Sequence, residues 1–273
     1  MHIDELLKTA ERCASNNTSM VVPEHWSQGD TVFGGLTAAL LFHVTSPLAT
    51  LGRPLYSVKT NFISSLLIDT PFTFEIELLH EDSRHSKVTG RIVQNDEVVV
   101  VQHSCFGVAI ASSASLVNPP QQTPQLPSFE LLPKLHATAA DRPTDNNASY
   151  TQQVDFAIAK TPQPNTTQDV SHNHGWMKLK ASPVRTTGAH LICLIDAWPK
   201  DVSTEVNTRN AGTIMMWNLE FPAANHEDLG TQWFAYQSDI RKMAGGYAHV
   251  EANIWNEDNH LVAISRQSVD LAS

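Results

Sequence analysis

The stretch Thr187–Pro199, TGAHLICLIDAWP, decides how the rest of the chain is interpreted. Its apolar residues leave no broad polar face, which is typical of a buried helix. Thr187 can cap the N-terminus through its hydroxyl oxygen, and Pro199 ends the helix because proline has no N–H to donate. The pattern therefore predicts a helix that follows Thr187 and lies in the core.

The last turn of this helix carries an acid, Asp196. A carboxylate on a buried helix is costly unless it is paired or hydrogen-bonded. The carbonyl-rich C-terminal end of a helix disfavours negative charge further. Two interpretations are open at this point: Asp196 faces solvent at the helix end, or it is a buried acid held there for chemistry.

Composition places limits on what the chain can be. Its 273 residues, 41% hydrophobic and 17% charged, suit two globular domains with a substantial core. A net charge of −10 argues against a nucleic-acid partner, because neutralising phosphates needs clustered Lys and Arg. Three scattered cysteines predict neither a disulfide framework nor a metal site, and we expect no cofactor. No apolar run suits a signal peptide or a membrane span, so we expect a soluble, cytoplasmic protein without a membrane partner.

The order of expected elements occurs twice. After an amphipathic N-terminal helix, an apolar helix over 31–44, capped by Asp30, precedes four strands at 56–64, 72–79, 87–94 and 97–108. The helix with Asp196 likewise precedes strands at 212–222, 231–239, 247–255 and 261–271. Adjacent glycines, Gly34 and Gly35, indicate that another backbone or a ligand approaches the first of these helices closely.

Residues 111–175 separate the two halves and hold eight of the 15 prolines. They read as a connector interrupted by one strand at 150–159. We therefore expect an N-terminal domain over 1–112, a linker over 113–148 and a C-terminal domain over 149–273. The predicted class is α+β: each half is an antiparallel sheet wrapped around a long buried helix. The halves pair edge to edge into one continuous sheet with both helices on one face, since a lone sheet would leave an edge exposed.

Strand alternation predicts where two further polar side chains point. In 212–221, Thr213 shares its expected face with Trp217 and Leu219, and in 261–269 Gln267 shares the inner face with Ser265. Each alone has a structural explanation, because threonine suits any strand and glutamine can end one. Together with Asp196 they converge on one sheet–helix interface. A hydroxyl and an amide can hydrogen-bond a buried carboxylate and keep it ionised.

These residues resemble the acyl-CoA thioesterases of the double-hotdog, thioesterase II type. Phe33-Gly34-Gly35, preceded by Trp26, is similar to the family's opening helix, and the segments around Asp196, Thr213 and Gln267 are similar to its three catalytic segments. The likeness spans nearly the whole chain except the connector. The strand Trp217–Phe221 departs from the family's more aromatic, histidine-bearing pattern, so it gives no indication of acyl preference.

The resemblance implies hydrolysis of an acyl-CoA thioester, with Asp196 activating water and with Thr213 and Gln267 orienting the water or the acid. Backbone N–H groups at a helix N-terminus, near Gly34 and Gly35 or near Gly188, would stabilise the oxyanion. It also implies a homo-oligomer, a dimer of double-hotdog chains, acting in fatty acid metabolism.

Coenzyme A phosphates need a basic patch, and the best candidates in the first half are Arg84 and Lys87, with Arg241-Lys242 as their counterpart. The alternative is that these are solvated turn charges. His43 lies near the position equivalent to Asp196 but is interpreted as a helix-end histidine, so we expect one site per chain. Two other functions stay open: a non-catalytic acyl-CoA or acyl-carrier binding protein, and a hotdog hydratase, although no Asp/His pair is placed near a helix start.

Overall fold

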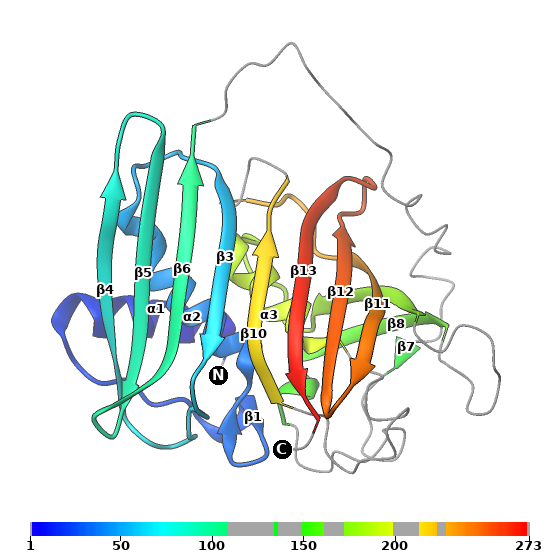
Figure 1. Ribbon diagram of the computed structural model, residues 1–273, viewed down its shortest axis with the longest axis horizontal. Helices are drawn as coiled ribbons and strands as arrows, with labels where there is room; N and C mark the ends of the chain where they lie inside the picture. The colour runs from blue at the N-terminus through cyan, green and yellow to red at the C-terminus, as the bar shows by residue number, and fades with distance from the viewer. Residues whose placement is uncertain are drawn as a thin grey trace.

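One antiparallel sheet organises the molecule (Figure 1). The structure is a computed structural model that describes residues 2–108, 134–135, 149–160, 172–198, 213–222 and 228–271. Within these ranges the sheet has 11 strands in the order β4-β5-β6-β3-β10-β13-β12-β11-β9-β8-β7. The strands of the N-terminal half are β3 (Leu55–Phe62), β4 (Phe72–Glu81), β5 (His85–Gln94) and β6 (Glu97–Gly107). Those of the C-terminal half are β7 (Lys134–Leu135), β8 (Val154–Lys160), β9 (His172–Leu179), β10 (Thr213–Glu220), β11 (Phe234–Ala244), β12 (Tyr247–Trp255) and β13 (Leu261–Asp270).

The two halves join through β3 and β10, whose antiparallel register pairs Thr60 with Trp217. The helices α1 (Ile3–Asn16), α2 (Gly34–Thr45) and α3 (Gly188–Ala197) lie behind the sheet, on one face of it (Figure 1). Short 3₁₀ turns, η1 (Glu24–Trp26), η2 (Ser46–Leu48) and η3 (Ser149–Gln153), and a small hairpin of β1 (Ser27–Gln28) and β2 (Thr31–Val32) complete the described chain. The expected tandem hotdog architecture is confirmed.

The start of the first buried helix differs from the prediction. Thr31 and Val32 pair with Gln28 and Ser27 as a hairpin, so they are not helical, and Asp30 lies in the hairpin turn rather than at a helix cap. The helix begins at Gly34, with Phe33 at the N-cap position. Pairing of β1 with β2 takes the backbone groups that a longer helix would need.

The second half also holds more strands than the alternation predicts. Gly175-Trp176-Met177 lies within β9, and the strand expected over 150–159 begins only at Val154, after η3. Both faces of β9 are buried, with Trp176 on one side and Met177 on the other, which removes the apolar–polar alternation that would reveal it. Apart from β7, the predicted linker 113–148 lies outside the described residues.

The N-terminus of α3 has the predicted cap. Thr187 accepts a hydrogen bond from the backbone of the third helical residue, His190, whose side chain in turn accepts from the backbone N–H of Thr187. The other ring nitrogen of His190, Nε2, lies 2.9 Å from Asp4 Oδ1 and ties α1 to α3. None of the helices that the structure describes is long and apolar enough to cross a membrane.

The helices α2 and α3 pack closely because of one glycine. A Cβ at Gly35 would lie 2.7 Å from the backbone oxygen of Cys193 in α3 and 2.6 Å from the ring of Phe33. Both distances are shorter than van der Waals contact, and the oxygen belongs to a helix that cannot yield locally. The expectation that another backbone comes close to the paired glycines is therefore met at Gly35.

Gly35→Ala should destabilise the fold by forcing α2 away from α3. Overpacking of this kind costs about 1–3 kcal/mol. Gly34→Ala is the matched control, since its Cβ meets only side-chain atoms, the nearest at 3.1 Å. Urea unfolding should show a larger loss for Gly35→Ala than for Gly34→Ala, and equal stability of the two variants would contradict this account of the helix contact.

Candidate active site

Asp196 is buried beneath the sheet, with 3% of its surface exposed, which excludes the solvent-facing interpretation. It lies in the last turn of α3. Gln267 on β13 is also buried, and its Nε2 donates a hydrogen bond to Asp196 Oδ1 at 3.1 Å. The side chain amide thus supplies a donor that a buried carboxylate requires. Gln267 is at an inward-facing position, as the alternation of β13 predicts.

The other carboxylate oxygen points toward the start of α2. A Cβ built on Gly34 would be 3.1 Å from Asp196 Oδ2, so the absence of a side chain at Gly34 leaves room for the acid. The N-terminus of a helix carries a partial positive charge from its unpaired N–H groups. Asp196 therefore sits at the unfavourable end of its own helix and beside the favourable end of the neighbouring one.

Thr213 does not share a face of β10 with Trp217, although strict alternation predicts that it does. A β-bulge between Ile214 and Met216 changes the phase of β10, so that Trp217 pairs with Gln267 but Thr213 pairs with Asp270. Positions 267 and 270 point to opposite faces of a strand. Thr213 is consequently exposed at the strand end rather than buried with Trp217. Bulges often re-aim a side chain in this way beside a functional site.

Asp196, Thr213 and Gly34 line a common cavity of about 390 Å³. It opens between the two halves, beside the β1–β2 hairpin and the chain that follows β3. The wall is mixed, with hydroxyl groups and apolar side chains. Its other lining residues are Gln28, Thr31, Val32, Thr37, Phe62, Ile63, Ser64, Ser65, Leu66, Val100, Ile214, Met215 and Asp270. Gln267 is not among them, so it contacts the acid from behind.

Sequence reasoning missed several polar residues of this wall, among them Thr37 and Asp270. Thr37 stands one turn after Gly34 on α2, and its hydroxyl donates to the backbone oxygen of Phe33. Its helical spacing from Gly34 could have indicated that it faces the same way. Asp270 ends β13 opposite Thr213, and only the strand register brings it to the cavity.

The structure does not bring Arg84 and Lys87 to this cavity. Ser86, between them, pairs with Phe106, which pairs with Leu55 at the beginning of β3. The cavity lies at the other end of β3, about 20 Å away at the rise of an extended strand. Both side chains are exposed in the β4–β5 hairpin region.

Arg241 and Lys242 lie at the cavity end of the sheet. Lys242 pairs with His249, which pairs with Ser268, which pairs with Met216 of β10. Three inter-strand spacings separate them, or about 14 Å. Arg241 is half exposed and forms an ion pair with Glu251 at 3.0 Å. None of the described residues that line the cavity is Lys or Arg.

Two other titratable residues of the helices, Cys193 and His43, do not line the cavity. Burial raises the pKa of the Cys193 thiol well above its ordinary value, and the nearby charge of Asp196 raises it further, so the thiol stays protonated. Desolvation lowers the pKa of His43, although Glu11 of α1, 4.0 Å from its ring, opposes the shift. His43 packs toward α1, away from the cavity wall.

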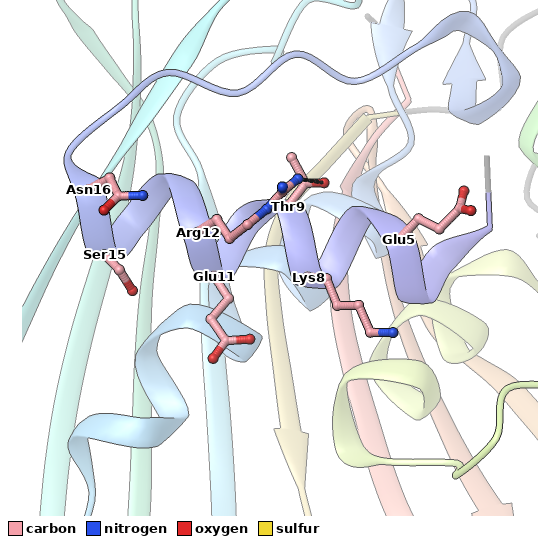
Figure 2. Close-up of a pocket in the computed structure, with 7 residues that line it drawn as sticks. All are labelled: Glu5, Lys8, Thr9, Glu11, Arg12, Ser15 and Asn16. Atoms are coloured by element: carbon pink, nitrogen blue, oxygen red, sulfur yellow. Dashed lines mark hydrogen bonds between the residues drawn. The ribbon is translucent and has the colours of Figure 1, made fainter.

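A second hollow lies along the outer side of α1 (Figure 2). Its side chains, among them Glu5, Lys8 and Arg12, extend from a single helix, and Arg12 donates to Thr9. They do not converge on a shared point in Figure 2, which is typical of a solvated helix face. The hollow along α1 therefore offers no converging group of side chains for chemistry.

Comparisons with known proteins agree with this placement of the two halves. The family profile for the acyl-CoA thioesterase N-terminal domain matches residues 22–107, and the profile for the acyl-CoA thioesterase C-terminal domain matches residues 131–270. A search of curated proteins finds no match.

Solved structures show a similar fold. The chain is similar to a conserved protein of unknown function with a hot dog fold from Alicyclobacillus acidocaldarius, at 19% identity, covering 94% of this chain and 92% of that chain, with a TM-score of 0.77. It is also similar to the TesB protein of Mycobacterium avium subspecies paratuberculosis, at 17% identity, covering 98% of this chain and 98% of that chain, with a TM-score of 0.70. A third similar structure is an acyl-CoA thioesterase II from Mycobacterium marinum, at 17% identity, covering 92% of this chain and 90% of that chain, with a TM-score of 0.66. At these identities the likeness establishes the tandem hotdog fold.

The hydrogen bond from Gln267 to Asp196 can be measured with a double-mutant cycle. Gln267→Met should lower the free energy of unfolding by about 1–3 kcal/mol, because a buried carboxylate oxygen loses its donor. The same change should cost less when Asp196 is already Ala. Gln102→Met is the matched control, since the buried Gln102 amide donates to the Ala38 carbonyl at 3.0 Å instead of to an acid. Equal costs of Gln267→Met with and without Asp196 would show that the two side chains are uncoupled.

Proposed function

This chain belongs to the acyl-CoA thioesterase family of thioester hydrolases, and we propose that it hydrolyses an acyl-CoA through a water molecule activated by Asp196. The observation that carries the proposal is the setting of this carboxylate. One oxygen accepts from Gln267, and the other is directed to Gly34 at the edge of a cavity. A fixed acceptor at a cavity edge suits a general base.

In the proposed reaction the water oxygen attacks the thioester carbonyl carbon while Asp196 takes the proton that the water loses. The carbon–sulfur bond of the tetrahedral intermediate then breaks, and coenzyme A leaves as a thiolate that takes up a proton. The products are a carboxylic acid and a free thiol. Gln267 holds the acid, and Thr213, which lines the cavity, orients the water or the substrate.

The negative charge on the carbonyl oxygen needs donors, and we propose the N–H groups of Gly34 and Gly35. The first N–H groups of a helix have no acceptor within the helix. Gly188 is a poorer candidate, because it begins α3 and lies about 12 Å along the helix from Asp196. The N-terminus of α2 thus faces both the acid and the oxyanion that forms in the same reaction.

Asp196→Ala should lower kcat for thiol release by about 10²- to 10⁴-fold, the usual contribution of a general base. The assay follows free thiol from acyl-CoAs of short, medium and long chain. Asp258→Ala, in the exposed β12–β13 turn, is the control and should keep full activity. Full activity of a folded Asp196→Ala variant would remove Asp196 from the mechanism. Binding of acyl-CoA without thiol release at any chain length would favour the non-catalytic binding protein.

Two pairs of basic residues are candidates for anchoring the coenzyme A phosphates. The sequence favours Arg84 and Lys87, whereas the geometry favours Arg241 and Lys242, which lie at the cavity end of the sheet. We expect the double substitution of Arg241 and Lys242 by Ala to raise KM with little change in kcat, because phosphate anchoring is uniform binding. The double substitution of Arg84 and Lys87 is the comparison. An unchanged KM in both variants would place the phosphate site elsewhere.

We propose four further properties from the family resemblance alone. The substrate carries a fatty or other acyl group, and the reaction belongs to fatty acid metabolism. The protein is cytoplasmic and forms a dimer of double-hotdog chains. Light scattering of the purified protein tests the dimer directly.

A further inference from the structure

The start of α2 is held by an aromatic contact between the two halves. Tyr150 of η3, in the C-terminal half, stacks on Phe33, with ring centroids 3.9 Å apart and an angle of 4° between the planes. Phe33 is 1% exposed and occupies the N-cap position of α2. Two parallel rings in contact restrain both the position and the tilt of Phe33.

Phe33 lacks the polar side chain that usually fixes a helix start. Its backbone N–H donates to the Trp26 carbonyl at 2.9 Å, and its carbonyl accepts from Thr37 N at 3.0 Å. Its ring also packs over Gly35, where an added Cβ would be 2.6 Å from it. Movement of the Phe33 ring would therefore move the first turn of α2, which carries the N–H groups proposed to bind the oxyanion.

Tyr150 has a firm attachment of its own. The 3₁₀ turn η3 leads directly into β8, and the carbonyl of Gln153 accepts from Lys180 N at 2.9 Å, just after β9. The turn also packs against η1 and β1 of the N-terminal half. The C-terminal half, which contains Asp196, thus also contacts the start of α2 in the N-terminal half.

We propose that Tyr150 is a positioning residue: by stacking on Phe33 it holds the N–H groups of Gly34 and Gly35 in register with Asp196 across the boundary between the halves. The inference rests on the proposed function, since it concerns the geometry of the same reaction. It extends that function by making alignment of the oxyanion donors depend on a side chain that does not line the cavity.

The experiment compares Tyr150→Ala, Tyr150→Leu and Tyr150→Phe in the full chain. Phe retains the stacked ring and should keep kcat within about twofold of the parent. Ala should lower kcat by about 10- to 100-fold with KM nearly unchanged, because small misplacements of catalytic groups have effects of this size. The kcat of Tyr150→Leu, in which the side chain fills space without a flat ring, should lie between those of Tyr150→Ala and Tyr150→Phe. This variant serves as the test if Tyr150→Ala does not fold.

Tyr56→Ala is the matched control, since the Tyr56 ring packs on Gly107 at the opposite end of β3. It should cost stability without a comparable loss of kcat. Unchanged kcat in Tyr150→Ala and Tyr150→Leu, a rise in KM alone, or an equal loss in Tyr150→Phe would each overturn the proposal.

Hydrogen exchange gives a readout that does not depend on activity. Tyr150→Ala should speed amide exchange at Phe33 and Thr37, whose N–H groups donate to the Trp26 and Phe33 carbonyls, relative to the parent and to Tyr56→Ala, and unaltered exchange there would also overturn the proposal. If the parent protein releases no thiol, the proposed reaction fails, whereas the exchange result still decides whether Tyr150 holds the helix start.

Discussion

The close contact between α2 and α3 is the constraint on which the site depends. Gly35 lets the two helices approach until only a hydrogen atom fits against the Cys193 carbonyl, and Gly34 leaves space for the carboxylate of Asp196. The N-terminus of α2 consequently lies beside the C-terminal turn of α3. The positive potential at the N-terminus of α2 offsets the negative potential at the C-terminus of α3, and it therefore stabilises a carboxylate that α3 alone would disfavour. Two adjacent residues without side chains thus create both the packing and the electrostatic setting.

The two halves share one architecture but differ in the polar side chains that they bury. The register around the central pair Thr60–Trp217 makes Gln102 on β6 the counterpart of Gln267 on β13. Asp196 comes eight residues after Gly188, the first residue of α3. The equivalent position in α2, eight residues after Gly34, is Phe42, whose ring packs against Phe106. The N-terminal half therefore keeps the buried amide and lacks the acid. Among the described residues of α2 and α3, only the C-terminal half therefore places a carboxylate at the helix contact, and the N-terminal half supplies the helix N-terminus beside it.

Local patterns succeeded where one interaction dominates. The alternation along β13, the apolar helix after Thr187 and the order of helix and strands in each half follow from burial of apolar side chains, and the observed elements agree with them. The same reasoning failed where a tertiary contact overrides the local preference. Pairing of β1 with β2 delays the start of α2, burial of both faces conceals β9, and the bulge at Met215 reverses the direction of Thr213. A single inserted residue is invisible to a period-two pattern, because the residue types on both sides of it remain compatible with a strand.

The amino-acid sequence by itself determined the α+β class, the repeated order of helix and strands, the buried helix that carries Asp196 and the inward position of Gln267. These depend on hydrophobic periodicity and on residues near one another in the chain. Only the tertiary structure decided that Asp196 Oδ2 faces Gly34, that Asp270 and Thr37 share its cavity, and that Arg84 and Lys87 lie at the far end of the sheet. Those relations depend on strand register and on the distance between two helices, which are set by packing between residues far apart in the sequence.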